Sequence, residues 1–244
     1  MRSSNPILND GIFSDEHVLA GPVMTVSGTM NKLLILSLIM ISGAAAVFYQ
    51  FSLNHFDFVN MIMKLGIGVS FIIAIVLFFK RDLTPFLAPV YAFAQGAVLS
   101  GISCFFEKEM PGIVSQAISM TLVVVFTMAF LFKTGLVVAT AKFRSTLIIA
   151  TVSVFVFYLI SVLLMFFGVN VPYFTSNSNI NILLNVAFAL IAAFNLILDF
   201  DFVEKGAMAP LPVLYEWYGA FGLLVTILWI YVEILRLLAR FNRR

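Results

Sequence analysis

The chain has 244 residues, of which 62% are hydrophobic and only 11% are charged, and its formal net charge is +2. In soluble domains about a quarter of the residues are charged. This composition therefore excludes a soluble globular protein and indicates an integral membrane protein. The basic residues are scattered among short connections, which gives no argument for binding of nucleic acid.

The first 30 residues are polar, MRSSNPILNDGIFSDEHVLAGPVMTVSGTM, and lack the charged-then-apolar order of a signal peptide. We interpret residues 1–30 as an N-terminal arm and residues 31–244 as a single polytopic membrane domain. His17, His55 and Cys104 have no neighbours at metal-ligand spacing, and no phosphate-binding loop or nucleophile motif occurs. We therefore expect a protein that is not an enzyme and holds no permanent cofactor.

Seven apolar segments follow the arm. A bilayer core about 30 Å thick requires about 20 apolar residues in helical form. The sequence predicts an all-α membrane protein with helices at 33–53, 59–80, 83–106, 110–132, 145–168, 180–201 and 213–238. The last region begins with Pro210 and Pro212 and is longer than one span requires, so the alternative is six spans and a re-entrant C-terminal segment.

The distribution of Lys and Arg predicts the orientation. Basic residues occur in the N-terminal region and in the second, fourth and sixth connections, whereas the first and fifth connections have none. The positive-inside rule then predicts a cytoplasmic N-terminus. Seven spans would place the C-terminal Arg240, Arg243 and Arg244 outside, against the same rule.

Two aspartates interrupt the end of the sixth apolar segment, NLILDFDFVEK. Asp199 is the stronger functional candidate, because Asn195 lies one turn earlier on the same helix face and extends its polarity. Asp201 points to nearly the opposite face and, with Glu204, also fits the solvated end of a helix.

Three further polar residues occur at membrane depth. Glu233 lies in ILWIYVEILRLL, one turn before Arg236, which fits either an intrahelical ion pair or a proton or ion path. Gln95, in the third segment, carries an amide that requires a hydrogen-bond partner, and an acid of the sixth or seventh helix could supply it.

Six stretches of the sequence together resemble the Bax inhibitor family of membrane proteins, the YccA-like group with the transmembrane Bax-inhibitor motif. They are SSNPILND, MTVSGTMNK at 24–32, APVYAFAQG at 88–96, TGLVVATAKFR at 134–144, NLILDFDFVEKGA at 195–207 and EWYGAFGLLVTILWIYVEILRLL at 216–238. The resemblance covers the whole length and is greatest to a bacterial branch. It implies seven helices, six of them surrounding the C-terminal one, in a multi-pass protein of the bacterial cytoplasmic (inner) membrane.

The resemblance also implies a pH-sensitive Ca²⁺ leak channel with a sensor made of two acids near the ends of the last two helices. The sixth-helix acid corresponds to Asp199, with Asp201 as competitor, and the seventh-helix acid to Glu233. Glu216 stays a candidate because it would lie closer in depth to Asp199. Gln95, Asn195 and Arg236 are candidates for lining or latching the pathway, while Asp199 and Glu233 would bind Ca²⁺ weakly and transiently.

Two carboxyl groups in a low-dielectric site hold one proton between them, and loss of that proton makes them repel. We therefore expect a proton-gated cation leak whose partners are the lipid bilayer, cations and protons. Two alternatives stay open. One is a proton-coupled cation antiporter, and the other is a non-transporting regulator of a stress response or of a membrane protease, the latter suggested by the YccA resemblance.

Overall fold

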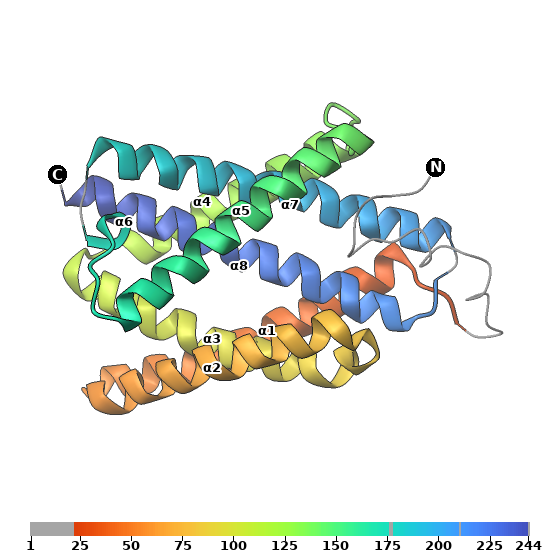
Figure 1. Ribbon diagram of the computed structural model, residues 1–244. Helices are drawn as coiled ribbons and strands as arrows, with labels where there is room; N and C mark the ends of the chain where they lie inside the picture. The colour runs from red at the N-terminus through yellow and green to blue at the C-terminus, as the bar shows by residue number, and fades with distance from the viewer. Residues whose placement is uncertain (1–21, 176–177, 210, 244) are drawn as a thin grey trace. The chain divides into compact units, whose positions relative to one another are not determined.

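The computed structural model describes residues 22–175, 178–209 and 211–243, and this part of the chain is almost entirely helical (Figure 1). The elements are α1 (Val26–Ser52), α2 (Phe56–Phe79), the 3-10 turn η3 (Arg81–Leu83), α3 (Thr84–Glu109), α4 (Ile113–Lys133), α5 (Ala141–Phe166), α6 (Pro172–Thr175), α7 (Asn179–Met208) and α8 (Leu214–Asn242). Seven of these helices are long and apolar enough to cross a membrane. The prediction of an all-α protein with seven spans is confirmed.

The helices extend beyond several predicted boundaries. Of the predicted N-terminal arm, residues 1–21 lie outside the described part, and its last residues already belong to α1. Thr25 caps this helix, because its hydroxyl accepts a hydrogen bond from the Gly28 amide at 2.9 Å. The sixth span continues past Asp201 to Met208 instead of ending among the acids.

The C-terminal region does not turn back within the membrane. Leu214–Asn242 is one uninterrupted helix of 29 residues, which corresponds to about 44 Å at 1.5 Å per residue. Near its end, the Arg240 guanidinium donates a hydrogen bond to the backbone carbonyl of Tyr173 in α6. The end of α8 therefore lies beside the connection between α5 and α7, and the re-entrant alternative is wrong.

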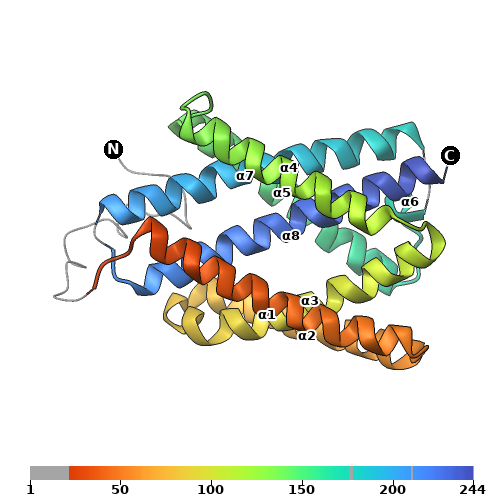
Figure 2. The same ribbon diagram turned by 180° about the vertical axis from the view of Figure 1, so that it is seen from behind.

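The chain divides into two compact units, and α7 and α8 contribute to both. Among the described residues, the first unit comprises Ser115–Asp201 and the chain from Thr226 onward. In it, the first part of α7 and the last part of α8 run antiparallel (Figures 1 and 2). Its core is aromatic: Tyr173 and Phe188 are buried, and the ring centroids of Phe157 and Tyr173 are 5.2 Å apart.

Among the described residues, the second unit comprises 22–114, 202–209 and 211–225. Helices α1 and α3 approach each other closely in it, because glycines remove the side chains between them. A Cβ atom at Gly96 would lie 2.0 Å from the Met40 carbonyl oxygen, and one at Gly43 would lie 2.2 Å from that of Phe93. Small residues at helix contacts allow this approach in membrane proteins.

Candidate functional site

Asp199 lies on α7 in the first unit and faces α8. The Thr226 hydroxyl is the hydrogen-bond partner of its carboxylate. The second carboxylate oxygen, Oδ2, is buried and has no hydrogen-bond partner among the described residues. A carboxylate oxygen that is shielded from water and unpaired is costly when it is ionised. Within the described residues, an ionised Asp199 is thus uncompensated inside the membrane span α7.

Asp201, the competing candidate, points to a different partner, as its spacing from Asp199 predicts. Its carboxylate forms an ion pair with Arg144 near the start of α5. Asp201 is 8% exposed, so this pair is largely shielded from solvent. Asp201 is compensated where Asp199 is not. The partner was missed from the sequence because Arg144 counts there only as one basic residue of a connection.

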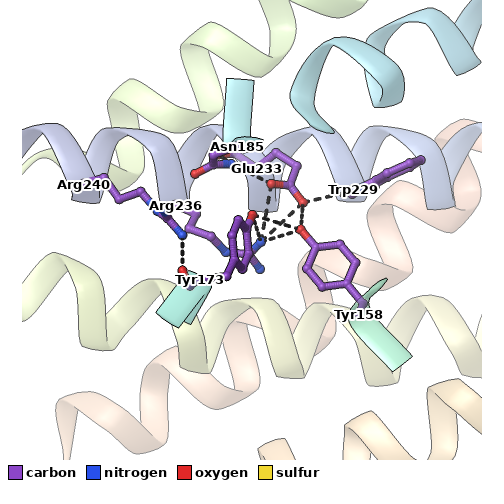
Figure 3. A network of polar contacts seen from close by, with 7 residues as sticks. All are labelled: Tyr158, Tyr173, Asn185, Trp229, Glu233, Arg236 and Arg240. Atoms are coloured by element: carbon purple, nitrogen blue, oxygen red, sulfur yellow. Dashed lines mark hydrogen bonds and ion pairs between the residues drawn. The ribbon is translucent and has the colours of Figure 1, made fainter. Parts of the chain in front are cut away.

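Glu233 is almost completely buried on α8, and its carboxylate accepts hydrogen bonds from four different side chains (Figure 3). The Tyr158 hydroxyl lies 2.5 Å from Oε1 and the Asn185 amide nitrogen 2.6 Å from Oε2. The Trp229 indole N–H lies 3.2 Å from Oε1, and the Arg236 guanidinium is 3.4 Å from both oxygens. The intrahelical Glu233–Arg236 pair predicted as one alternative is present, within a larger network.

Arg236 is held mainly by aromatic side chains. Its Nη1 donates to the hydroxyls of Tyr158 at 2.6 Å and Tyr173 at 3.1 Å. The guanidinium carbon also lies 5.4 to 5.7 Å from the ring centroids of Tyr158, Tyr173 and Phe174, which is the range of cation–π attraction. The two tyrosines were missed as polar partners, because aromatic residues are common along the whole chain.

The structure does not bring Asp199 and Glu233 together. Asp199 contacts Thr226, which precedes Glu233 by seven residues and therefore lies about 10 Å away along the axis of α8. The reason is the length of the two helices, because α7 continues to Met208 and carries Asp199 away from the depth of Glu233. The predicted proton-sharing carboxyl pair is absent from this conformation, and a carboxyl–hydroxyl pair occupies the place expected for it.

Glu216 belongs to the second unit and holds the start of α1. Its Oε1 accepts hydrogen bonds from the Thr25 amide and the Thr25 hydroxyl, each at 2.9 Å, and its Oε2 forms an ion pair with Lys32. Gly28 leaves room for this carboxylate, since a Cβ atom there would lie 2.0 Å from Oε1. These contacts account for the burial of Glu216 as a structural residue that holds the start of α1.

The two amide candidates differ. Asn195 on α7 donates to the Thr151 hydroxyl of α5 and to the Ile191 carbonyl, both at 2.8 Å, so it joins two helices. Gln95 is half-buried on α3, and within the described part of the chain no hydrogen bond of its side chain is found. The acid partner predicted for Gln95 is therefore not seen.

Neither unit gathers the ligands of a stable metal site. In the residues that the structure describes, no group of three or more His, Cys, Asp or Glu side chains could hold a metal ion. Calcium prefers six to eight oxygen ligands, and Asp199 with Thr226 offers only a carboxylate and a hydroxyl. Any cation at this place would keep most of its water.

The comparison with known families agrees with this architecture. A family model described as Bax inhibitor 1 like matches residues 5–243. The chain belongs to the Bax inhibitor 1 like family. No curated protein and no solved structure matches it.

The contacts of the structure connect the stretches that resemble the family. The ion pair of Arg144 with Asp201 joins the stretch 134–144 to 195–207, and the contacts of Glu216 with Thr25 and Lys32 join 216–238 to 24–32. The stretch SSNPILND lies outside the described residues. The family and the seven apolar helices together identify a multi-pass membrane protein that contacts the lipid bilayer.

Proposed function

We propose that this member of the Bax inhibitor 1 like family is a pH-sensitive cation leak channel and that Asp199 is its proton sensor. The observation that carries the proposal is the unpaired, buried Oδ2 of Asp199 beside the hydroxyl of Thr226 in a membrane span. Ionisable residues inside membrane helices mark proton or ion pathways by default.

The chemistry of the pair supports gating by a proton. Protonated Asp199 has a hydroxyl of its own, and the Thr226 hydroxyl can donate or accept, so the pair is satisfied in the neutral state. After loss of the proton, the shielded oxygen requires water or a cation. Entry of either between α7 and α8 would open a path beside Asp199. The channel then conducts better as the pH rises.

Calcium is the proposed cation, since a carboxylate and a hydroxyl are hard oxygen ligands. Two such groups bind Ca²⁺ weakly, and weak binding allows the ion to leave as readily as it enters. We further propose the bacterial inner membrane with a cytoplasmic N-terminus as the setting.

Glu233 has a different part in this proposal. Arg236 compensates its charge, and Tyr158, Asn185 and Trp229 saturate its oxygens, so ionised Glu233 is stable where it lies. We assign it a holding role for the contact of α8 with α5 and α7. The sensor therefore consists of one acid and one hydroxyl, and not of the two acids that the resemblance implies.

The test is Ca²⁺ flux into liposomes that contain only the purified protein, measured from pH 5 to pH 8. The proposal requires flux down the Ca²⁺ gradient without any other gradient, with a rate that increases with pH. Ca²⁺ flux that occurs only when a proton gradient is imposed would identify an antiporter instead. Absence of flux at every pH would favour the non-transporting regulator, including a partner of a membrane protease.

A further inference from the structure

We propose that Arg240 and Arg236, at the C-terminal end of α8, bind a phosphate group, which either the headgroup of an anionic lipid or free inorganic phosphate can supply. This site is separate from Asp199 and does not depend on the proposed channel activity. Figure 3 shows both arginines together with Tyr173.

Arg240 is a buried cation with an unused donor. The residue is 5% exposed, and its Nη2 donates to the Tyr173 carbonyl. Its Nη1 is buried, and no residue in the described part of the chain forms a hydrogen bond with it. The guanidinium carbon lies 4.6 Å from the centroid of the Tyr173 ring, so the ring fixes the plane of the group. An oriented guanidinium with an unpaired buried N–H points to an anion.

The charges near Arg240 do not balance. Of the acids in the described part of its unit, Asp201 pairs with Arg144, Asp199 contacts Thr226, and Glu233 pairs with Arg236. The connection between α5 and α7, FGVNVPYFTSNS, contains no acid at all. Among the described residues, the charged neighbours of Arg240 are Arg236 and Glu233, so one positive charge is left without a described counter-charge. A buried cation without a counter-charge is costly in a membrane protein.

Arg236 completes the site. The side chain of Arg236 is 24% exposed, and all its hydrogen bonds in the described residues use Nη1 alone. Both guanidinium groups lie within 6 Å of the centroid of the same ring, that of Tyr173, at 5.7 Å for Arg236 and 4.6 Å for Arg240. Planar guanidinium forks match phosphate oxygens in pairs, and two neighbouring forks suit a group with several such oxygens.

The position on the helix identifies phosphate as the anion. Arg240 lies in the last turn of α8, which ends at Asn242, and so at the end of a membrane span, where phospholipid headgroups lie. The C-terminus of α8 contributes about half a negative charge, but the N-terminus of the antiparallel α7 contributes about half a positive one at the same end. The two helix ends cancel, and the extra guanidinium sets the sign of the field.

The experiment uses the delipidated full chain in an uncharged maltoside detergent. Trp217 is replaced by Phe, so that Trp229, which touches Glu233, is the sole fluorescent tryptophan. One arm adds inorganic phosphate against chloride at equal ionic strength. The other adds phosphatidylglycerol against diacylglycerol, which lacks the phosphate. Each arm records the Trp229 emission and the midpoint of thermal unfolding.

We expect a saturable change of Trp229 emission and, at a tenfold excess over the dissociation constant, a rise of the midpoint by about 3 °C or more. Response in both arms identifies a general phosphate site, and response in only one arm identifies the source. Arg240→Gln should abolish the response, whereas Arg243→Gln, which removes an exposed charge at the same helix end, should keep it.

If Arg240→Gln does not fold, Arg240→Lys decides, since it keeps the charge but loses the fork and should weaken binding by about tenfold. The proposal is overturned if neither arm exceeds its control, or if the Arg240 and Arg243 variants respond alike.

Discussion

The carboxylate of Asp199 on α7 is hydrogen-bonded to the hydroxyl of Thr226 on α8, and its other oxygen is buried without a partner in the part of the chain that the structure describes. In the proposal above, this pair is the proton sensor. The other two acids in the described part of the same unit, Asp201 and Glu233, are each paired with an arginine. The first prediction therefore concerns these two residues.

Asp199→Asn keeps the shape of the side chain and its hydrogen bond to Thr226 but removes the titrating group. We expect Ca²⁺ flux in liposomes to lose most of its dependence on pH between 5 and 8, while the protein stays folded. Thr226→Val should shift the pH profile, because it removes the hydrogen-bond partner that the described residues give Asp199. The control is Glu204→Gln, an exposed acid on the same helix, which should leave the profile unchanged. An unaltered profile in Asp199→Asn would mean that the sensor lies elsewhere.

The second prediction concerns the ion pair of Arg144 with Asp201. Asp201→Asn leaves the largely shielded guanidinium of Arg144 without its counter-charge. For a buried pair, this lowers the free energy of unfolding by about 3 kcal/mol. We expect a clearly lower unfolding midpoint in detergent but a retained pH dependence of flux. Replacing both residues by apolar ones, Arg144→Met with Asp201→Leu, should restore most of the stability. A double variant less stable than the single one would contradict this account.

Whether a feature of this arrangement could be predicted depends on how far apart in the sequence the interacting residues are. The existence of seven apolar spans depends on local composition, so the sequence predicts their number, but it does not predict where α7 and α8 end. The divergence of Asp199 and Asp201 was also predictable, because two helical positions two residues apart point in nearly opposite directions. Both features required only neighbouring residues.

The partners of the acids could not be predicted in the same way. Arg144 and Asp201 are 57 residues apart, and Tyr158 and Glu233 are 75 apart, so only the packing of helices brings them together. Thr226 gives no signal of its own, since a threonine in a membrane helix usually bonds to its own backbone. The pairing of Asp199 with Glu233 was expected from resemblance and requires equal depths, which the lengths of α7 and α8 do not provide.

The third prediction concerns Glu233 and Tyr158, whose Oε1 and hydroxyl oxygen are 2.5 Å apart. Glu233→Gln leaves Arg236 without its counter-charge, and Tyr158→Phe leaves an oxygen of Glu233 with fewer donors. Each change should lower stability, and the double variant should cost less than the sum, with a coupling of about 1 to 3 kcal/mol. Chemical unfolding of the four proteins in one detergent measures this term. Strict additivity would show that the hydrogen bond contributes nothing.

In the same proteins the pH dependence of flux should persist, because Glu233 holds helices and does not sense protons in our proposal. Loss of that dependence in Glu233→Gln, together with normal stability, would restore the two-acid sensor.

The fourth prediction concerns Gly28, where a methyl group would collide with the carboxylate of Glu216. Gly28→Ala should displace Glu216 from Thr25 and Lys32 and lower the unfolding midpoint, although alanine favours helices. Gly68→Ala is the matched control, because nothing lies within 4 Å of that position on α2. The control should be neutral or stabilising by up to about 1 kcal/mol. Equal effects of the two substitutions would show that Glu216 does not depend on this space.

The last prediction concerns the sides of the membrane. Single cysteines at Ser178, Thr140 and Asn242 are introduced into a chain in which the buried Cys104 is replaced by Ala. The contact between Arg240 and Tyr173 places the end of α8 beside the connection that contains Ser178, so an impermeant thiol reagent should label Ser178→Cys and Asn242→Cys from the same side. Thr140→Cys lies in the connection before α5, one span away, and should react only after permeabilisation if the N-terminus is cytoplasmic. Labelling of all three from outside would reject a simple seven-span topology, whereas the exact reverse pattern would keep the fold and invert its orientation.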